Sequence, residues 1–186
     1  MNDEFITELS VKQLRLIRHS FMNNLQVIYA YLQINKPEKA IDYIKEINKK
    51  VLRLSLIYNL DNPLFSLMMQ DIVMEIDKFG LDYEINTLID CIPNEIFTKN
   101  KSETFYLFEI LKNKLVEGIK NTEENKKIYI EVAKNDHIYV TFCNTELKEE
   151  LKNADSEMVY SHDDIELKFF KFGNSFLIQL IIHQSR

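Results

Sequence analysis

The sequence predicts an α+β fold, in which an N-terminal antiparallel helical hairpin precedes helices set against a mostly antiparallel sheet. Apolar residues recur at three- and four-residue steps over residues 5–60, a spacing typical of amphipathic helices. Asp-Asn-Pro at 61–63 then indicates a boundary, because the residue before a proline is driven out of helical geometry. Beyond it, apolar and polar residues alternate on either side of turn residues, as in β-hairpins.

Residues 5–34 are predicted to form one long helix, since no proline or glycine interrupts them. An apolar stripe follows this helix. Its members are Leu14, Ile17, Phe21, Leu25, Ile28 and Leu32. A second apolar arc widens the surface beyond what one partner helix would cover. That arc consists of Leu16, Val27, Tyr31 and Ile34.

Asn35-Lys36-Pro37 is the predicted turn, because Pro37 suits the first turn of a following helix. That second helix, over 38–60, repeats apolar residues with the 3.5-residue period of bundle packing. These residues are Ala40, Ile44, Ile47, Val51, Leu54 and Tyr58. Two helices alone make a poor core, so we expect the hairpin to dimerise into a four-helix bundle. The alternative is that it packs on the rest of its own chain.

We assign residues 1–61 to the helical hairpin and 62–186 to a second domain. Within the second domain the patterns predict two helices, one strand, a short charged helix and two hairpins. In order, these are a helix at 64–78, a strand at 81–86, a helix at 102–121 capped by Ser102, a hairpin turning at Asn135-Asp136, the charged helix at 146–153, and a hairpin turning at Gly173-Asn174.

Composition excludes several classes of function. The net charge of −6 argues against nucleic acid, because phosphate binding needs a basic face. Cys91 and Cys143 lie far apart, which argues against zinc and disulfides and favours a reducing cytoplasm. The acidic start is not a signal peptide, and no apolar run approaches the roughly 20 residues that span a bilayer. We therefore expect a cytoplasmic protein that binds neither membrane nor nucleic acid.

Glycine is scarce, with only three in 186 residues. Loops that cradle phosphates need closely spaced glycines, because backbone amides must approach the phosphate and often take positive φ. Gly80, Gly118 and Gly173 are too far apart for any of the usual nucleotide-binding motifs. The sequence thus argues against a glycine-rich nucleotide site.

His19 is the candidate catalytic residue of the first helix. At about 100° per residue, it shares one sector with polar residues, opposite the apolar stripe. That sector contains Lys12, Arg15, His19, Asn23 and Gln26. On position alone, the simpler interpretation is an ordinary solvated histidine.

The charge around His19 favours a functional interpretation. No acidic residue lies between Glu8 and Glu38, although the protein as a whole is acidic. The basic residues Lys12, Arg15, Arg18 and Lys36 are present there instead. Such a stretch would attract a phosphoryl group or an acidic pocket, and a neutral imidazole offers a nucleophilic nitrogen. The alternative is a chance depletion of acids.

The remaining histidines are weaker candidates. His162 lies in Ser-His-Asp-Asp, which could bind a divalent ion, but consecutive ligands fit a polar loop better. His137 follows a turn and His183 lies near a strand end, so both are interpreted as structural. No Ser-His-acid arrangement is supported by the spacing.

The motif Arg18-His19-x-x-x-Asn23-x-Leu25-Gln26 resembles the phosphoacceptor helix of the sporulation initiation phosphotransferase B family and of related sensor histidine kinases. The segments QINKPEKAIDYIKEI and YNLDNP also resemble that family, so the likeness covers roughly residues 10–70. Beyond these, LDYEI and the order of elements look like a degenerate histidine-kinase ATP-binding domain.

The resemblance implies a homodimer in which His19 is phosphorylated. It would carry a phosphoryl group from the aspartate of one response regulator receiver to another, with Mg²⁺ supplied by the receiver and no cofactor of its own. Asn23 and Gln26 would hydrogen-bond the ring or the phosphoryl oxygens. The implied docking surface for the receiver comprises Lys12, Arg15, Arg18, Ser20 and Met22.

The chain departs from the family at two places. Ser20 stands where the family has an acid, which argues against autophosphorylation. In the segment 111–122, Asn113 matches the first asparagine of the kinase nucleotide box, but Glu117 replaces the Mg²⁺-holding asparagine. We therefore expect an ATP-independent histidine phosphotransferase. The alternatives are a non-catalytic protein that sequesters a regulator or kinase, which Ser20 favours, and a sensor histidine kinase.

Overall fold

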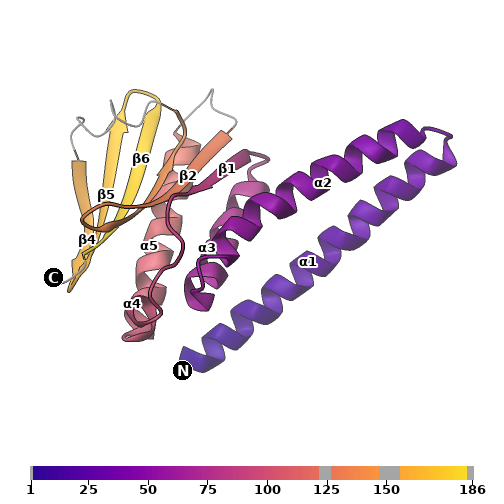
Figure 1. Cartoon of the computed structure of the whole chain (residues 1–186). Coiled ribbons are helices and arrows are strands. Elements are labelled where there is room, and N and C mark those ends of the chain that lie inside the picture. The colour runs from indigo at the N-terminus through magenta and orange to yellow at the C-terminus, as the bar shows by residue number, and fades with distance from the viewer. Residues whose placement is uncertain (1, 122–126, 147–155, 184–186) are drawn as a thin grey trace. The chain divides into compact units, whose positions relative to one another are not determined.

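The computed structural model describes residues 2–121, 127–146 and 156–183. Its elements are α1 (Asn2–Gln33), α2 (Pro37–Tyr58), α3 (Pro63–Lys78), β1 (Asp82–Thr87), α4 (Glu95–Thr98), α5 (Lys101–Lys120), β2 (Lys127–Lys134), β3 (Ile138–Cys143), β4 (Ser156–His162), β5 (Ile165–Phe172) and β6 (Ser175–Ile182) (Figure 1). The α+β fold class is confirmed. The chain divides into two compact units, Met1–Ser55 and Leu56–Arg186. The functional boundary after residue 61 stays a prediction.

The first unit is the predicted helical hairpin. α1 is one uninterrupted helix of 32 residues, and α2 follows after a short turn. Asn35 takes a φ of 55°, the left-handed conformation that commonly ends helices. The N–H of Lys36 then donates to the carbonyl of Tyr31 at 2.9 Å, so a carbonyl of the last turn of α1 is satisfied. Pro37 opens α2, as the sequence predicts.

α3 is the first helix that contributes to the core of the second unit. Asn62 caps this helix, since its side-chain oxygen accepts from the N–H of Phe65 at 2.9 Å, and Pro63 fills the first position. Three buried rings join α3, α4 and α5: the centroids of Phe65 and Phe97 lie 5.6 Å apart, and those of Phe97 and Phe108 lie 5.7 Å apart. These rings form the centre of the helical layer.

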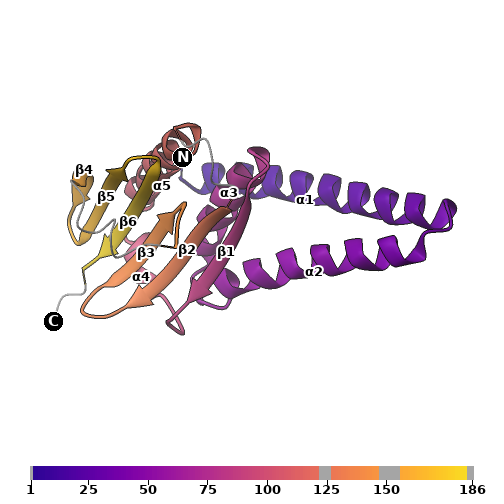
Figure 2. The ribbon, with the colours of Figure 1, turned by 90° about the horizontal axis from the view of Figure 1, so that it is seen from above.

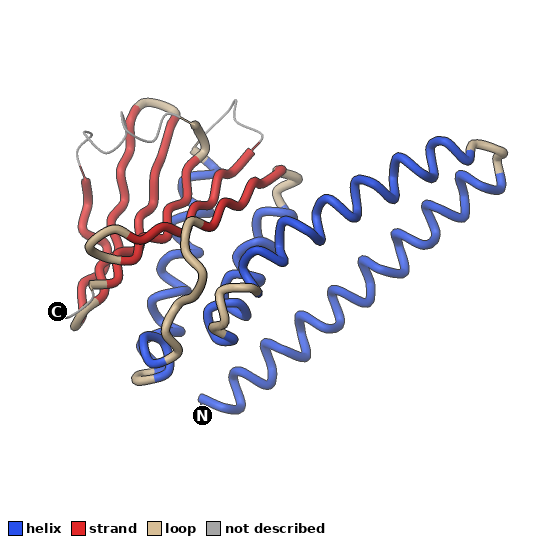
Figure 3. The backbone as a smooth tube through the Cα atoms, viewed as in Figure 1, coloured by secondary structure: helices blue, strands red, loops and turns tan. Residues whose placement is uncertain are grey.

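The sheet has six strands in the order β1-β2-β3-β6-β5-β4 (Figure 2). Its β1–β2 pair is parallel and the remaining pairs are antiparallel, which confirms the predicted mostly antiparallel sheet. α3 and α5 cover one face of it (Figure 3). α5 approaches β6 closely because Gly118 has no side chain: an added Cβ would lie 2.8 Å from the ring of Phe176.

The end of β3 is fastened to the turn between β5 and β6. Asn144 is 3% exposed, and its side-chain oxygen accepts from the N–H of Phe176 at 2.8 Å. Its amide nitrogen donates to the carbonyl of Asn174 at 3.0 Å. Gly173 takes a φ of 55° in that turn, which a glycine adopts without strain. The predicted hairpin at Gly173-Asn174 is thereby confirmed, as is the hairpin at Asn135-Asp136.

Three predictions about elements need correction or lie outside what is described. Ser102 is not the cap of α5: Asn100 is, because its side-chain oxygen accepts from the N–H of Glu103. The interpretation of the His162 segment as a loop was wrong, since His162 ends strand β4 and only Asp163 and Asp164 form the turn. Apart from Glu146, the predicted helix over 146–153 lies outside the described residues.

Candidate functional site

The candidate site lies on the outer flank of α1. His19 sits near the middle of this helix and is exposed, as the sequence predicts. The helix is rigid there because every residue from 2 to 33 continues the same hydrogen-bonded ladder, without proline or glycine. The imidazole is therefore held at a fixed position along a continuous helix, where another protein can contact it.

Asn23 lies one turn after His19, and the two side chains are in contact. The amide nitrogen of Asn23 is 3.2 Å from Nδ1 of His19. Residues four apart on a helix face the same side, which explains the contact. An amide can present either its nitrogen or its oxygen to the ring, so this neighbour can select which imidazole nitrogen carries the proton.

The other residues predicted around the site are also exposed on α1. They are Lys12, Arg15, Arg18, Ser20, Met22 and Gln26. Gln26 shares the sector of His19 two turns on, and it is Asn23 that contacts the ring. The structure thus brings Asn23 to the ring, while the basic residues contribute charge near it.

α2 contacts a different side of α1 from the one that carries His19. Tyr43 of α2 donates to the side-chain oxygen of Asn24 at 2.8 Å, and its ring packs edge-to-face on Tyr31 at 6.4 Å. Asn24 and His19 are five residues apart, which places them about 140° apart around the helix axis. The hairpin contact therefore leaves the histidine uncovered.

The stretch of α5 that resembles a nucleotide box is occupied by ion pairs. Lys114 Nζ lies 3.1 Å from Glu117 and 3.2 Å from Glu157, and it sits over the ring of Phe169 at 5.2 Å. Burial alone would lower the pKa of Lys114, but its bonds to the two glutamates outweigh that and raise it. Glu117 therefore serves as a partner for a lysine.

The other histidines lie in the second unit. His137 and His183 come together, with ring centroids 4.4 Å apart, because β3 pairs with β6. His162 lies with each ring nitrogen near a carboxylate, 3.6 Å from Glu103 and 3.5 Å from Asp163. Within the residues that the structure describes, no group of three or more potential ligands is arranged to hold a metal ion. Sequence spacing did not reveal these contacts, since they depend on strand register.

None of the helices in the described ranges combines the length and apolarity that a bilayer requires.

Comparisons with known proteins give a family match for the hairpin. Among solved structures, the chain is similar to the histidine kinase AdeS of Acinetobacter baumannii, with a TM-score of 0.41 and 10% identity over 90% of this chain and 98% of that one. Curated proteins gave no match. Residues 1–60 match the family described as the alpha-helical domain of SpoOB-type sensor kinases, which confirms the resemblance inferred from the motif. The match covers about a third of the chain, so it is the hairpin that is similar to the helical domain of such kinases.

Proposed function

We propose that this protein is a histidine phosphotransferase of a phosphorelay. His19 accepts a phosphoryl group from the aspartate of one response regulator receiver and passes it to another, without ATP. The observation that carries the proposal is an exposed imidazole, bonded to Asn23, on a helix within the match to the alpha-helical domain of SpoOB-type sensor kinases. The match covers only the first 60 residues, so the activity of the whole chain belongs to this proposal.

The transfer is a displacement at phosphorus. A ring nitrogen of His19 attacks the phosphoryl group, a phosphorus–nitrogen bond forms, and the bond to the receiver aspartate breaks to release its carboxylate. Nε2 is the attacking atom when Nδ1 holds the proton. Asn23 favours that tautomer when its side-chain oxygen faces Nδ1 and accepts that proton's hydrogen bond.

The remaining contributions are electrostatic and positional. The cations Lys12, Arg15 and Arg18 attract the acidic pocket of a receiver, while Gln26, Ser20 and Met22 extend the docking surface. The receiver supplies the Mg²⁺ that neutralises the phosphoryl oxygens. The hairpin therefore catalyses mainly by holding the nucleophile in line with a group that the partner has already activated.

Two features of α5 support independence from ATP. Glu117, at the position of the Mg²⁺-holding asparagine, is ion-paired with Lys114. A carboxylate there also places a negative charge where a nucleotide would bring its phosphates.

The exposed stripe of α1 supports the homodimer in this proposal. Leu14 and Phe21 are 65% and 58% exposed, although they belong to the apolar stripe that periodicity identifies. A second copy that covers the stripes of both hairpins would form a four-helix bundle. His19 would then remain on the outside, since its sector lies opposite the stripe.

The source of the phosphoryl group tests the proposal. The protein is incubated with a pre-phosphorylated receiver in one reaction and with labelled ATP and Mg²⁺ in another, with His19→Gln as the control. Acid-labile label acquired from the receiver alone, and lost in His19→Gln, is the expected result. Label acquired from ATP would identify a kinase. Receiver binding without any label would identify the non-catalytic sequestering protein that Ser20, in place of an acid, favours.

A further inference from the structure

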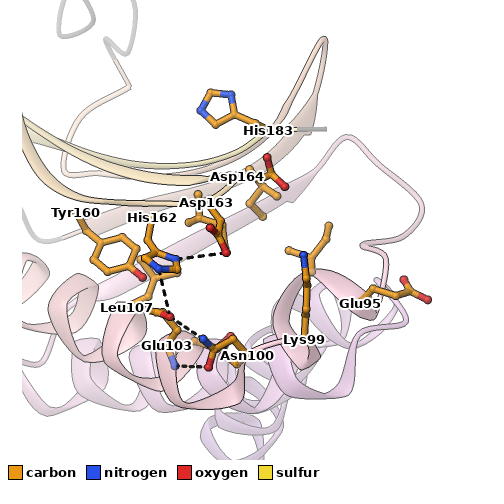
Figure 4. Close-up of a pocket in the computed structure, with 14 residues that line it drawn as sticks. Glu95, Lys99, Asn100, Glu103, Leu107, Tyr160, His162, Asp163, Asp164 and His183 are labelled. Carbon is orange, nitrogen blue, oxygen red and sulfur yellow. Dashed lines mark hydrogen bonds and ion pairs between the residues drawn. The ribbon is translucent and has the colours of Figure 1, made fainter. Parts of the chain in front are cut away.

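A cavity in the second unit is lined by none of the residues of the proposed phosphorelay. It measures about 230 Å³, is partly open to solvent, and is lined by α4, the start of α5, the β4–β5 turn and the end of β6 (Figure 4). Apolar side chains from both layers line it, namely Ile96, Leu107, Ile165 and Ile182. At about 30 Å³ per water molecule, this space equals roughly eight waters, which suits a ligand of about ten heavy atoms or fewer.

One side of the cavity is negatively charged and already organised. Glu103 accepts from the amide of Asn100 at 2.6 Å, and its carboxylate lies 3.6 Å from Nε2 of His162. Asp163 lies 3.5 Å from the other nitrogen of that ring. Burial and then the charges of Glu103 and Asp163 raise the pKa of Tyr160, which keeps its hydroxyl protonated beside them. Asp164, in the turn after β4, adds a further carboxylate to the lining.

The opposite side of the cavity carries a cation. Figure 4 shows Lys99 reaching into the open space across from His162 and Glu103, with Glu95 of α4 beside it on the same side. Within the described ranges, the side chains of Lys99 and Asp164 have no hydrogen-bond or ion-pair partner, in contrast to Glu103 and Asp163. An unpaired cation and an unpaired anion therefore flank a space with an apolar lining.

We propose that this cavity binds a small zwitterion, namely a free amino acid with an apolar side chain. Asp164 and the carboxylate of Glu103 receive the ammonium group, Lys99 receives the carboxylate, and the isoleucine and leucine side chains enclose the aliphatic part. Opposite charges on the two sides discriminate against ligands that carry only one of the two groups.

The position along α5 separates this cavity from the stretch that resembles a nucleotide box. Glu103 and Glu117 are fourteen residues apart on one helix, which corresponds to about 21 Å at the rise of an α-helix. The excess of carboxylates around the cavity also disfavours phosphates. The inference does not depend on the proposed phosphotransfer and can fail or succeed separately from it.

Three probes with the same branched stem test the inference on the full chain. They are leucine, isoamylamine, which lacks the carboxylate, and 4-methylpentanoate, which lacks the ammonium. Each is titrated while the backbone amide signals of residues that line the cavity are followed by NMR. Leucine should bind with a Kd on the order of 0.1–1 mM, the amine about tenfold more weakly and the acid more weakly still.

Substitutions then assign the two sides. Lys99→Gln should weaken leucine about tenfold and leave isoamylamine unchanged, while Asp164→Asn should weaken both. Lys134→Gln and Asp90→Asn change the same charges at exposed positions elsewhere in the unit, and they should leave all affinities unchanged. Absence of saturable binding by leucine would overturn the inference. So would equal affinity for leucine and either single-charge analogue, or equal effects of the variants and their controls.

Discussion

The two units of the chain bury their apolar residues to very different extents. In the hairpin, Phe21, Val51 and Leu52 are all more than half exposed. In the α/β unit, Phe65 and Phe97 are completely buried. The α/β unit therefore completes a core within one chain, whereas the hairpin leaves an apolar surface exposed, which the proposed second copy would cover. A hairpin with exposed apolar residues is suited to a domain that functions by binding other proteins.

The first prediction concerns the complete core. Phe65→Ala removes a ring that stacks on Phe97 and contacts Phe108. It should lower the free energy of unfolding by about 3–5 kcal/mol, because it deletes a fully buried aromatic side chain and leaves a cavity. Denaturant unfolding followed by circular dichroism measures the change. A loss below about 1 kcal/mol would mean that the α/β unit is as loosely packed as the hairpin.

The second prediction concerns the incomplete core. Phe21→Glu places a charge in the exposed stripe and should raise the Kd of the dimer about 100-fold or more, because the carboxylate would be buried without a partner. Ala30→Glu adds the same charge in the sector of His19 and is the matched control, which should remain dimeric. Sedimentation of both variants and the wild type provides the measurement. A monomeric wild type at micromolar concentration would refute the four-helix bundle.

The third prediction concerns Gly118, where α5 packs against β6 in the buried core of the α/β unit. Alanine in place of a helical glycine usually stabilises by up to about 1 kcal/mol. Here it should destabilise by about 1–3 kcal/mol, because the new Cβ would meet the ring of Phe176 at 2.8 Å. Combining it with Phe176→Leu should recover part of the loss in thermal unfolding. If Gly118→Ala stabilised the protein, the ring of Phe176 would have to move away from the new Cβ at little cost, which would contradict this prediction.

The smallest expected effect is a pH dependence of stability that comes from Glu166 on β5. The hydrogen bond from Lys168, at 2.8 Å, lowers the pKa of Glu166. A lowered pKa stabilises the fold above the ordinary glutamate pKa, and this contribution is lost as the pH falls through the folded value. Glu166→Gln should therefore reduce the acid-induced loss of stability by less than about 1 kcal/mol, since the pair is near the surface. Identical acid titrations of both proteins would contradict this.

The helical features were predictable because they depend on local periodicity. The exposure of His19, the contact with Asn23 four residues on, and the turn before Pro37 all follow from spacing along one chain segment. The cap of α5 was mistaken because Asn100 and Ser102 are both good capping residues, and the helix begins at Lys101, directly after Asn100. Local patterns alone do not make that choice.

The cavity and the paired histidines could not be predicted in this way. Residues 95–107 and 160–183 form one cavity only because β4, β5 and the end of β6 align beside α5. β4 itself lacks a clean alternation, since its register shifts between Met158 and Tyr160 at the sheet edge. The contact of His137 with His183 likewise depends on the pairing of Ile138 with Ile182. Such contacts require knowledge of strand register.

The most direct test of the central claim is where the phosphoryl group resides. After brief mixing with a phosphorylated receiver and no ATP, the protein is digested at neutral pH and its peptides are mapped by mass spectrometry. The account predicts one added phosphoryl group, labile to acid and stable to base, on His19. A phosphoryl group on any other residue, or an unmodified His19 peptide alongside a receiver that remains phosphorylated, would contradict it.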